Sequence, residues 1–274
     1  MSQLISDVEI GTFLSGGLDS SLVSFFASKY STQKIKSFSI GFEDKKFNEA
    51  SFAKKVANLI GTDHHELVLS NRELLDYALL IPKVYDEPFA DSSQIPMIAL
   101  TNLASNHVNV CLSGDGADEA FLGYPRNEYI KRISKFYSYF PYSFRKKIFK
   151  TLGFLKFSTL EKIYKFLSLF LPKNLKNRNF EFYYDKILSS LICSNIDELN
   201  NNLVSFFNQY SHDIVKSNST SHTLKDVTDY DIANYLPNDI LVKSDRASMY
   251  YSLENRSPFL NKEVMNYSRN KILQ

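Results

Sequence analysis

The sequence predicts an α/β protein with a doubly wound parallel sheet, followed by a helical lobe. Three observations support this class. Strand-like and helix-like segments alternate over residues 1–128, two of the strand-like segments end in glycine-bearing turns, and the strand signal fades from about Tyr129. Strands that alternate with helices imply parallel crossover connections. We therefore expect an α/β core over residues 1–128 and a helical lobe over residues 129–274.

The expected strands are short apolar or β-rich segments, of which the first is VEIGTFL. We place strands at residues 8–14, 35–42, 64–69 and 107–114. Glycine-bearing turns follow the first and the last of them, at residues 15–17 and 113–116. Ligands of doubly wound sheets lie beyond the carboxyl ends of the strands. Both turns are therefore candidate binding elements.

The expected helices lie between these strands, where apolar residues recur at helical spacing. We place them at residues 20–30, 48–61, 70–81 and about 95–105. The first should present one apolar face, made of Leu22, Val23, Phe26 and Ala27. From about residue 129 to about residue 210, Phe, Tyr, Leu and Lys recur at helical spacing, which predicts the helical lobe.

The composition is that of a globular protein, with 44% hydrophobic and 23% charged residues and a formal net charge of +2. Its two cysteines, Cys111 and Cys193, form no CxxC pair, which argues against a disulfide framework or a zinc site. No apolar run reaches the ~18 residues of a membrane-spanning helix. The N-terminus lacks the basic and apolar regions of a signal peptide. We therefore expect a cytoplasmic protein with no membrane partner.

The turn SGGLDSS, residues 15–21, follows a predicted strand and precedes a predicted helix. Gly16 and Gly17 let the backbone approach an anion closely, and the start of the helix turns free N–H groups toward it. The hydroxyls of Ser15, Ser20 and Ser21 can donate further hydrogen bonds. No lysine is present and the GxxxxGK[ST] spacing is absent, so this is not a Walker A loop.

Asp19 is the unusual residue of this turn. A carboxylate beside a phosphate repels it unless a cation lies between them, and Mg²⁺ held by Asp19 and phosphate oxygens resolves the conflict. The alternative is that Asp19 or Ser20 is an ordinary helix N-cap.

The string SGGLDSS resembles the pyrophosphate-binding loop (PP-loop) of the N-type ATP pyrophosphatases, which include asparagine synthetase, GMP synthetase, NAD synthetase and several tRNA-modifying enzymes. The resemblance implies an adenine-nucleotide alpha-hydrolase-like fold and cleavage of ATP between its α- and β-phosphates. It does not specify the acceptor. Leu14 and Ile40 match positions that flank the adenine in this group.

Residues 110–126 (VCLSGDGADEAFLGYPR) resemble the asparagine synthetase segment that faces the first loop. The resemblance implies that Ser113 and Gly114 border the adenosine and that Asp118 is a second Mg²⁺ carboxylate beside Asp19. Asp115 matches a carboxylate that binds or deprotonates ammonia, where many family members have Glu. The implied ATP-binding set is Leu14, Ser15, Gly16, Gly17, Asp19, Ser20, Ser21, Ile40, Ser113 and Gly114.

Residues 236–260 (LPNDILVKSDRASMYYSLENRSPFL) resemble the family's helical segment that packs over the active site, so we expect residues 236–262 to return to it. The candidate catalytic residues implied here are Asp239, Lys243, Arg246 and Glu254, beside Asp115. An ion pair between Glu254 and Arg256 is the structural alternative. DEPFADSSQIP matches a loop near the acceptor carboxylate, with Ser92 and Ser93 as candidate contacts.

Compared with that family, the sequence lacks an N-terminal glutaminase domain and a C-terminal tail whose lysine neutralises the departing pyrophosphate. We therefore expect ammonia to come from a separate glutaminase domain or subunit. We also expect nucleotide binding to survive better than turnover. Lys243 or Arg246 is the candidate substitute for the missing lysine.

The resemblance implies an ATP-dependent ligase that uses ATP and Mg²⁺, adenylates aspartate to β-aspartyl-AMP, releases pyrophosphate and transfers ammonia. Two alternatives stay open: an amidotransferase on another carboxylate, such as a sugar or peptide acid, and a nucleotide-binding remnant without turnover. Between residues 125 and 186 there are 15 Lys or Arg against 4 Asp or Glu. We do not favour a nucleic-acid partner, because these charges are interleaved with Phe, Leu and Ile, which is typical of lysines on packed helices.

Overall fold

The structure is a computed structural model of the 274-residue chain. It describes residues 2–44, 48–87, 91–124, 127, 139–153, 193, 198 and 224–272. The chain forms two compact units, one made of Met1–Phe121 with Ile232–Gln274 and one of Leu122–Asp231. The division at residue 128 and the boundaries drawn from the sequence stay predictions.

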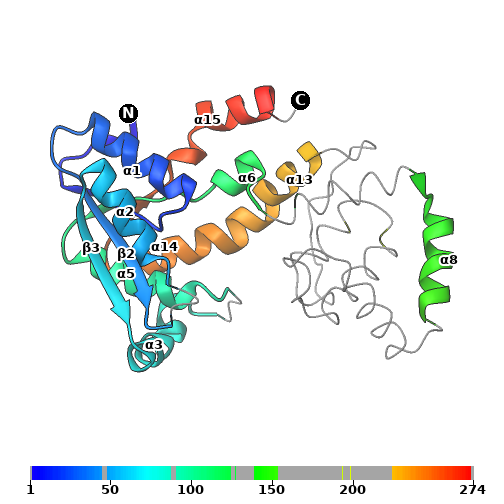
Figure 1. Ribbon diagram of the computed structural model, residues 1–274, viewed down its shortest axis with the longest axis horizontal. Coiled ribbons are helices and arrows are strands. Elements are labelled where there is room, and N and C mark those ends of the chain that lie inside the picture. Colours follow the sequence, from blue (N-terminus) through cyan, green and yellow to red (C-terminus); the bar gives the residue numbers. More distant parts are fainter. Residues whose placement is uncertain are drawn as a thin grey trace. The chain divides into compact units, whose positions relative to one another are not determined.

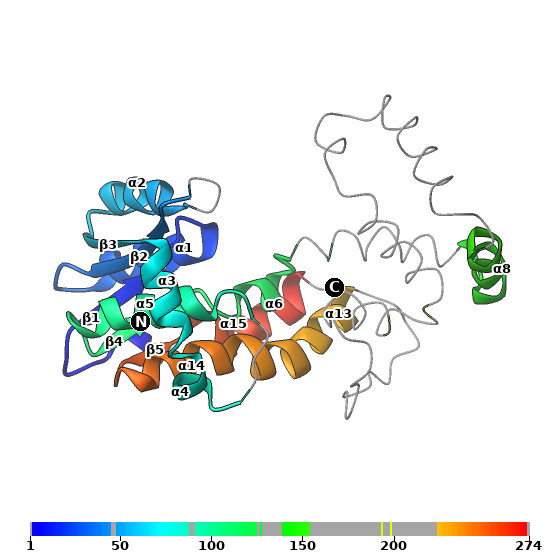
Figure 2. The same cartoon turned by 90° about the horizontal axis from the view of Figure 1, so that it is seen from below.

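The first unit contains the parallel sheet that the sequence predicts (Figure 1, Figure 2). Its strands are β1 (Ile10–Phe13), β2 (Lys36–Phe42), β3 (Asp63–Leu69), β4 (Val110–Leu112) and β5 (Glu254–Arg256). They lie in the order β3-β2-β1-β4-β5, and every neighbouring pair is parallel. The chain therefore winds outward from β1 to β3 and then returns to the other side of β1, which confirms the doubly wound α/β class.

The expected helices of this unit are confirmed, with an additional short one after the third. They are α1 (Leu18–Tyr30), α2 (Ala50–Ile60), α3 (Asn71–Ala78), α4 (Ile81–Tyr85) and α5 (Gln94–Ser105). Residues of α1 pack with Ile10 of β1, and residues of α2 pack with Leu14, which directly follows β1. On the opposite face, α5 packs with Phe13 and Phe38. Both faces of the sheet are thus covered, as a parallel sheet requires.

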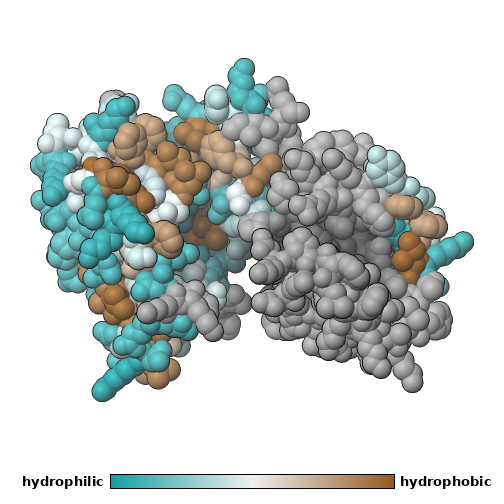
Figure 3. Space-filling model, viewed as in Figure 1, coloured by the Kyte–Doolittle hydropathy of each residue, from teal (hydrophilic) through white to brown (hydrophobic). Residues whose placement is uncertain are grey.

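The apolar face expected for α1 is only half buried. Val23 and Ala27 are in the core, but Leu22 and Phe26 are 38% and 47% exposed. Ser24 takes the neighbouring buried position, where its hydroxyl donates to Thr12 Oγ1 at 2.9 Å. A helix lying on a sheet buries a narrow stripe, so the outer pair stays at the surface. Figure 3 shows apolar side chains exposed in this region of the molecule.

The C-terminal part of the first unit differs from the expected continuous helical segment. A π-helix, η2 (Asp231–Ile240), leads into α14 (Leu241–Tyr250), and the chain then adds β5 to the sheet edge beside β4. The sequence did not predict β5 because its three residues, Glu-Asn-Arg, carry no β-forming signal. The remaining elements of this unit are η1 (Ser2–Leu4), α6 (Ala117–Phe121), η3 (Pro258–Leu260), α15 (Lys262–Tyr267) and η4 (Ser268–Ile272).

The second unit is described in α8 (Tyr142–Gly153) and α13 (Leu224–Tyr230). In α8 the buried Arg145 donates to the carbonyl oxygens of Phe140, at 3.1 Å, and Cys193, at 2.7 Å. Most of the predicted helical lobe and of its basic stretch lies outside the described residues. In the described part of the chain, every helix is too short or too polar to cross a bilayer.

Candidate active site

The two glycine-bearing turns meet at the point where the winding of the sheet reverses. β1 and β4 are adjacent and parallel, so the turns that follow them leave the same edge of the sheet. A Cβ added to Gly114 would lie 3.2 Å from the backbone nitrogen of Ser20 and 3.4 Å from Cβ of Asp19. The second turn therefore rests directly on the first turn of α1, which is the position where doubly wound sheets bind ligands.

The first turn is held in shape by its own hydroxyls. The backbone nitrogen of Gly17 donates to Ser15 Oγ at 3.2 Å, and Ser15 Oγ lies 2.9 Å from Ser20 Oγ. Ser21 instead donates back to the carbonyl oxygen of Gly17 at 2.5 Å. The N-cap of α1 is Gly17, and no side chain caps the helix. The capping alternative for Asp19 and Ser20 therefore has no support in the hydrogen bonds.

A cavity of about 390 Å³ opens at this edge of the sheet. It brings together many of the candidate residues: Leu14, Ser15, Gly17, Asp19, Ser20, Ile40, Ser93, Ser113, Gly114, Asp115 and Lys243. Its lining does not include the other candidates, which are Gly16, Ser21, Ser92, Asp118, Asp239, Arg246 and Glu254. The sequence analysis missed the rest of the wall, made of Phe13, Phe38, Ser39, Phe42, Glu49, Ala50, Ala53, Pro96, Met97 and Leu100.

The cavity has an apolar and a polar side. The apolar residues come from the ends of β1 and β2 and from α2 and α5, whereas both glycines and most of the serines and carboxylates come from the two turns. The polar lining residues outside these turns are Ser39, Glu49, Ser93 and Lys243. Such a combination can take an aromatic base at one side and an anion at the other. The polar side continues through Ser113, whose hydroxyl donates to Asp115 Oδ2 at 2.9 Å.

Asp19 fits a cation-binding role. It lies in the first turn of α1, and partial burial raises the pKa of its carboxyl above the ordinary value, against the lowering effect of a backbone hydrogen bond. A carboxylate that is costly to ionise alone gains from a cation beside it. Asp118 lies in the first turn of α6, three residues after the Ser113-Gly114-Asp115 turn.

The donor set at these turns fits Mg²⁺. Carboxylate and phosphate oxygens are its preferred ligands, and Mg²⁺ is usually held by one or two carboxylates with the rest of its shell from phosphates and water. Asp19 lines the cavity and could supply one of those carboxylates, whereas Asp118 is outside the lining. Among the described residues there is no group of three or more His, Cys, Asp or Glu side chains arranged to hold a metal without a nucleotide.

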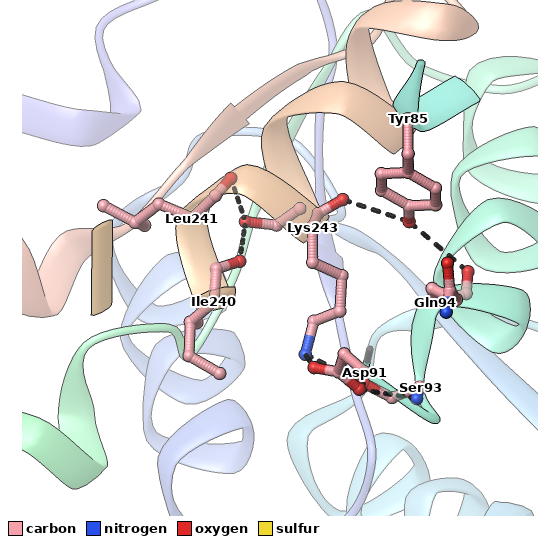
Figure 4. Close-up of polar contacts among 8 residues, drawn as sticks. Tyr85, Asp91, Ser93, Gln94, Ile240, Leu241 and Lys243 are labelled. Carbon is pink, nitrogen blue, oxygen red and sulfur yellow. Dashed lines mark hydrogen bonds and ion pairs between the residues drawn. The ribbon is translucent and has the colours of Figure 1, made fainter. Parts of the chain in front are cut away.

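Lys243 borders the cavity in a buried ion pair (Figure 4). Its Nζ donates to Asp91 Oδ2 at 2.6 Å and to Ser93 Oγ at 2.8 Å. Asp91 Oδ1 accepts from both the backbone nitrogen and the hydroxyl of Ser93, each at 2.6 Å. Burial alone would raise the pKa of Asp91, but hydrogen bonds from Lys243 and Ser93 outweigh it and hold the pKa below its ordinary value.

Asp239 stands beside this pair in the opposite electrostatic situation. Burial, followed by the charge and the hydrogen bond of Asp91, raises the pKa of Asp239 to about 6. Its Oδ1 is buried without a hydrogen-bond partner. Asp91 and Asp239 thus share one cationic neighbour, Lys243, whose hydrogen bond goes to Asp91. Of the two carboxyl groups, Asp239 is therefore the one that more readily keeps a proton.

The variant Asp239→Asn is expected to be more stable than the wild type above about pH 6. The folded-state pKa is raised above the ordinary 3.8, so the wild type loses stability as the pH rises from about 4 to about 6, and the asparagine variant lacks this loss. Urea unfolding from about pH 4 to about pH 8 measures the difference. The matched control is Asp76→Asn on the exposed side of α3. A variant less stable than the wild type at neutral pH would contradict this electrostatic account.

Of three other candidates, two are engaged elsewhere and one is exposed. Arg246 donates to the carbonyl oxygen of Tyr85 and, at 3.2 Å, to Glu87 Oε1. Glu254 Oε1 accepts from Arg256 Nε at 2.7 Å, and Glu254 pairs in the sheet with Val110, the first residue of β4. Glu254 therefore lies at the amino end of the strands, opposite the turns. Its contact with Arg256 is the ion pair of the structural alternative. Ser92 is exposed and precedes the cavity residue Ser93.

Comparison with known proteins finds similarity along almost the whole chain. A family model described as "Asparagine synthase" matches residues 1–270. The chain is 31% identical over 266 residues to "Asparagine synthetase [glutamine-hydrolyzing] 1" of Bacillus subtilis, covering 94% of this chain and 40% of that protein. A putative asparagine synthetase of Methanocaldococcus jannaschii is 41% identical over 141 residues, which are 48% of this chain and 27% of that protein. The chain thus spans less than half the length of these relatives.

Proposed function

The chain belongs to the asparagine synthase family, and from this premise we propose that it forms an amide from a carboxylate, ATP and ammonia. The observation that carries the proposal is the cavity at the carboxyl ends of the strands. Its apolar side suits an adenine ring, and the turn after β1, with its free helix N–H groups, suits the phosphates. Aspartate is the proposed acceptor because the similar curated proteins are named asparagine synthetases.

The proposed reaction has two steps. In the first, a side-chain carboxylate oxygen of aspartate bonds to the α-phosphorus of ATP, the bond from that phosphorus to the bridging oxygen breaks, and pyrophosphate leaves. The product is β-aspartyl-AMP. In the second, the nitrogen of ammonia bonds to the acyl carbon, AMP leaves with the electron pair of the broken C–O bond, and the nitrogen releases one proton. The products are asparagine and AMP.

The residues of the cavity would bind and orient the substrates and accept a proton. The hydroxyls of Ser15 and Ser20 and the N–H groups at the start of α1 would hold phosphate oxygens. Asp19 at the cavity and Asp118 in the first turn of α6 would hold Mg²⁺, which would neutralise phosphate charge. Asp115, on the same wall as Ser113, is the proposed acceptor of the proton from nitrogen. Positioning and charge neutralisation are then the protein's main contributions.

A glutaminase domain or subunit is the proposed source of ammonia. The names of the similar Bacillus subtilis and Methanocaldococcus jannaschii proteins describe them as glutamine-hydrolysing. Each of them is more than twice as long as the part that the chain matches.

The experiment that tests this function supplies the chain with MgATP, ammonium and one carboxylate at a time: aspartate, glutamate, a sugar acid or a peptide acid. We expect AMP, pyrophosphate and asparagine to form in equal amounts with aspartate only. Amide formation with another acid alone would favour the alternative acceptor. Release of ADP and phosphate would refute cleavage between the α- and β-phosphates.

A further inference from the structure

Two cations of α14, Lys243 and Arg246, contact the chain at the end of α4 and beyond it, on either side of residues 88–90. Figure 4 shows the contacts of Lys243. We call the described residues Tyr85–Glu87 and Asp91–Ser93 the acceptor segment. Lys243 contacts its second part through Asp91 and Ser93. Arg246 contacts its first part through the carbonyl oxygen of Tyr85 and the carboxylate of Glu87. The two cations are three residues apart, a spacing that puts side chains on the same side of a helix.

The contacts of Arg246 surround a strained residue. Asp86 has φ 63° and ψ −31°, a conformation that is unfavourable for residues with a Cβ. Such strain persists where the surrounding structure holds it. The two acceptors of Arg246 belong to the residues immediately before and after Asp86, so this side chain bridges the strained position.

The contacts of Lys243 leave little of its charge for a phosphate. The side chains of Lys243 and Asp91 are only 13% and 12% exposed. Two of the three ammonium protons of Lys243 are directed to Asp91 and Ser93, and the carboxylate neutralises its charge at 2.6 Å. Ser93 donates to Asp91 and accepts from Lys243, which closes a ring of hydrogen bonds at the cavity wall.

We propose that Lys243 and Arg246 are positioning residues, a two-point clamp by which α14 holds the acceptor segment and fixes Ser93 at the cavity, with Asp91 as the partner of Lys243. The clamp replaces the charge-neutralising role that the sequence suggested for these two cations. The clamp depends on the proposed function in one respect only, the identity of the substrate that Ser93 would contact.

A double-mutant cycle on the full chain tests the clamp. The variants are Lys243→Met, Asp91→Asn and their combination, with Lys55→Met and Asp76→Asn as exposed controls. We expect each single change to lower the aspartate-dependent kcat/KM by roughly 10- to 100-fold through misplacement. The double variant should lie within about threefold of the worse single one, because both changes break one contact. The Kd of MgATP should change by no more than about twofold.

Hydrogen exchange provides a readout that needs no turnover. The backbone nitrogen of Ser93 donates to Asp91 Oδ1, so Lys243→Met should speed exchange in the peptide that contains Ser93 by about tenfold, and the controls should not. Arg246→Met, at a partly exposed position that is less able to unfold the protein, should speed exchange around Glu87 and leave the Kd of MgATP unchanged.

Three results would overturn the clamp: losses in kcat/KM that multiply in the double variant, weaker MgATP binding by Lys243→Met, or unchanged exchange in both peptides. The first would mean that Lys243 and Asp91 act independently, and the second that Lys243 acts on the phosphates directly. If the wild type released no AMP with any carboxylate, the proposed function would fail, and the exchange measurements and the Kd of MgATP would still decide the clamp.

Discussion

Asp19→Asn is expected to lower kcat/KM for ATP by about 10²- to 10³-fold, the usual effect of losing one electrostatic contact at a reacting phosphate. The asparagine keeps the size of the side chain but cannot share a divalent cation with phosphate oxygens. Steady-state assays over a range of Mg²⁺ concentrations, with equilibrium binding of ATP, measure the loss.

Stability should not fall in this variant, which separates the loss of activity from unfolding. Burial raises the pKa of Asp19, so the fold itself gains nothing from the ionised carboxylate. Asp76→Asn, on exposed α3, is the matched control and should behave as the wild type. Equal activity of the Asp19 variant and the wild type at every Mg²⁺ concentration would contradict the proposal that Asp19 binds Mg²⁺.

Gly16→Ala is expected to reduce the free energy of unfolding by about 2–5 kcal/mol, from backbone strain together with overpacking. Gly16 has φ +85°, and an added Cβ would lie 2.7 Å from the backbone nitrogen of Ala53 and 2.8 Å from the carbonyl carbon of Phe52. Backbone atoms cannot move aside as a flexible side chain can. The turn would therefore separate from α2, and the proposed phosphate site would be lost with it.

Gly61 provides a closely matched control for this change. Its φ is +83°, but an added Cβ would meet nothing within 4 Å. Gly61→Ala should therefore cost only the strain of the left-handed backbone, about 1 kcal/mol. Urea unfolding of both variants measures the two effects, and ATP binding should weaken for Gly16→Ala alone. Equal losses of stability would mean that the close approach of the turn to α2 has no energetic role.

The sequence alone predicts the part of the fold that local signals determine. Alternating apolar segments and glycine turns predict β1 to β4 and the helices between them, and SGGLDSS marks the side of the cavity proposed to hold the phosphates. β5 could not be predicted in this way, because a three-residue edge strand of polar residues depends on pairing with β4, more than 140 residues earlier.

The remainder of the site depends on contacts between distant parts of the chain. Asp91 and Lys243 are 152 residues apart in the sequence. The residues around each of them give no indication that the two side chains pair. Phe38, Phe42, Met97 and Leu100 line the cavity, yet in the sequence they resemble ordinary core residues. Glu254 was a candidate because residues 236–260 resemble the family segment that packs over the active site, whereas its place at the amino end of β5 follows from the sheet register.

Photoaffinity labelling tests most directly the central claim that ATP binds at the strand ends between the two glycine turns. The chain would be irradiated with 8-azido-ATP and Mg²⁺, digested, and the labelled peptides identified by mass spectrometry. We predict labelling in peptides that contain Leu14, Ile40 or Met97, suppressed by excess ATP and reduced in Asp19→Asn. Labelling confined to peptides without cavity residues, or unaffected by excess ATP, would contradict the account.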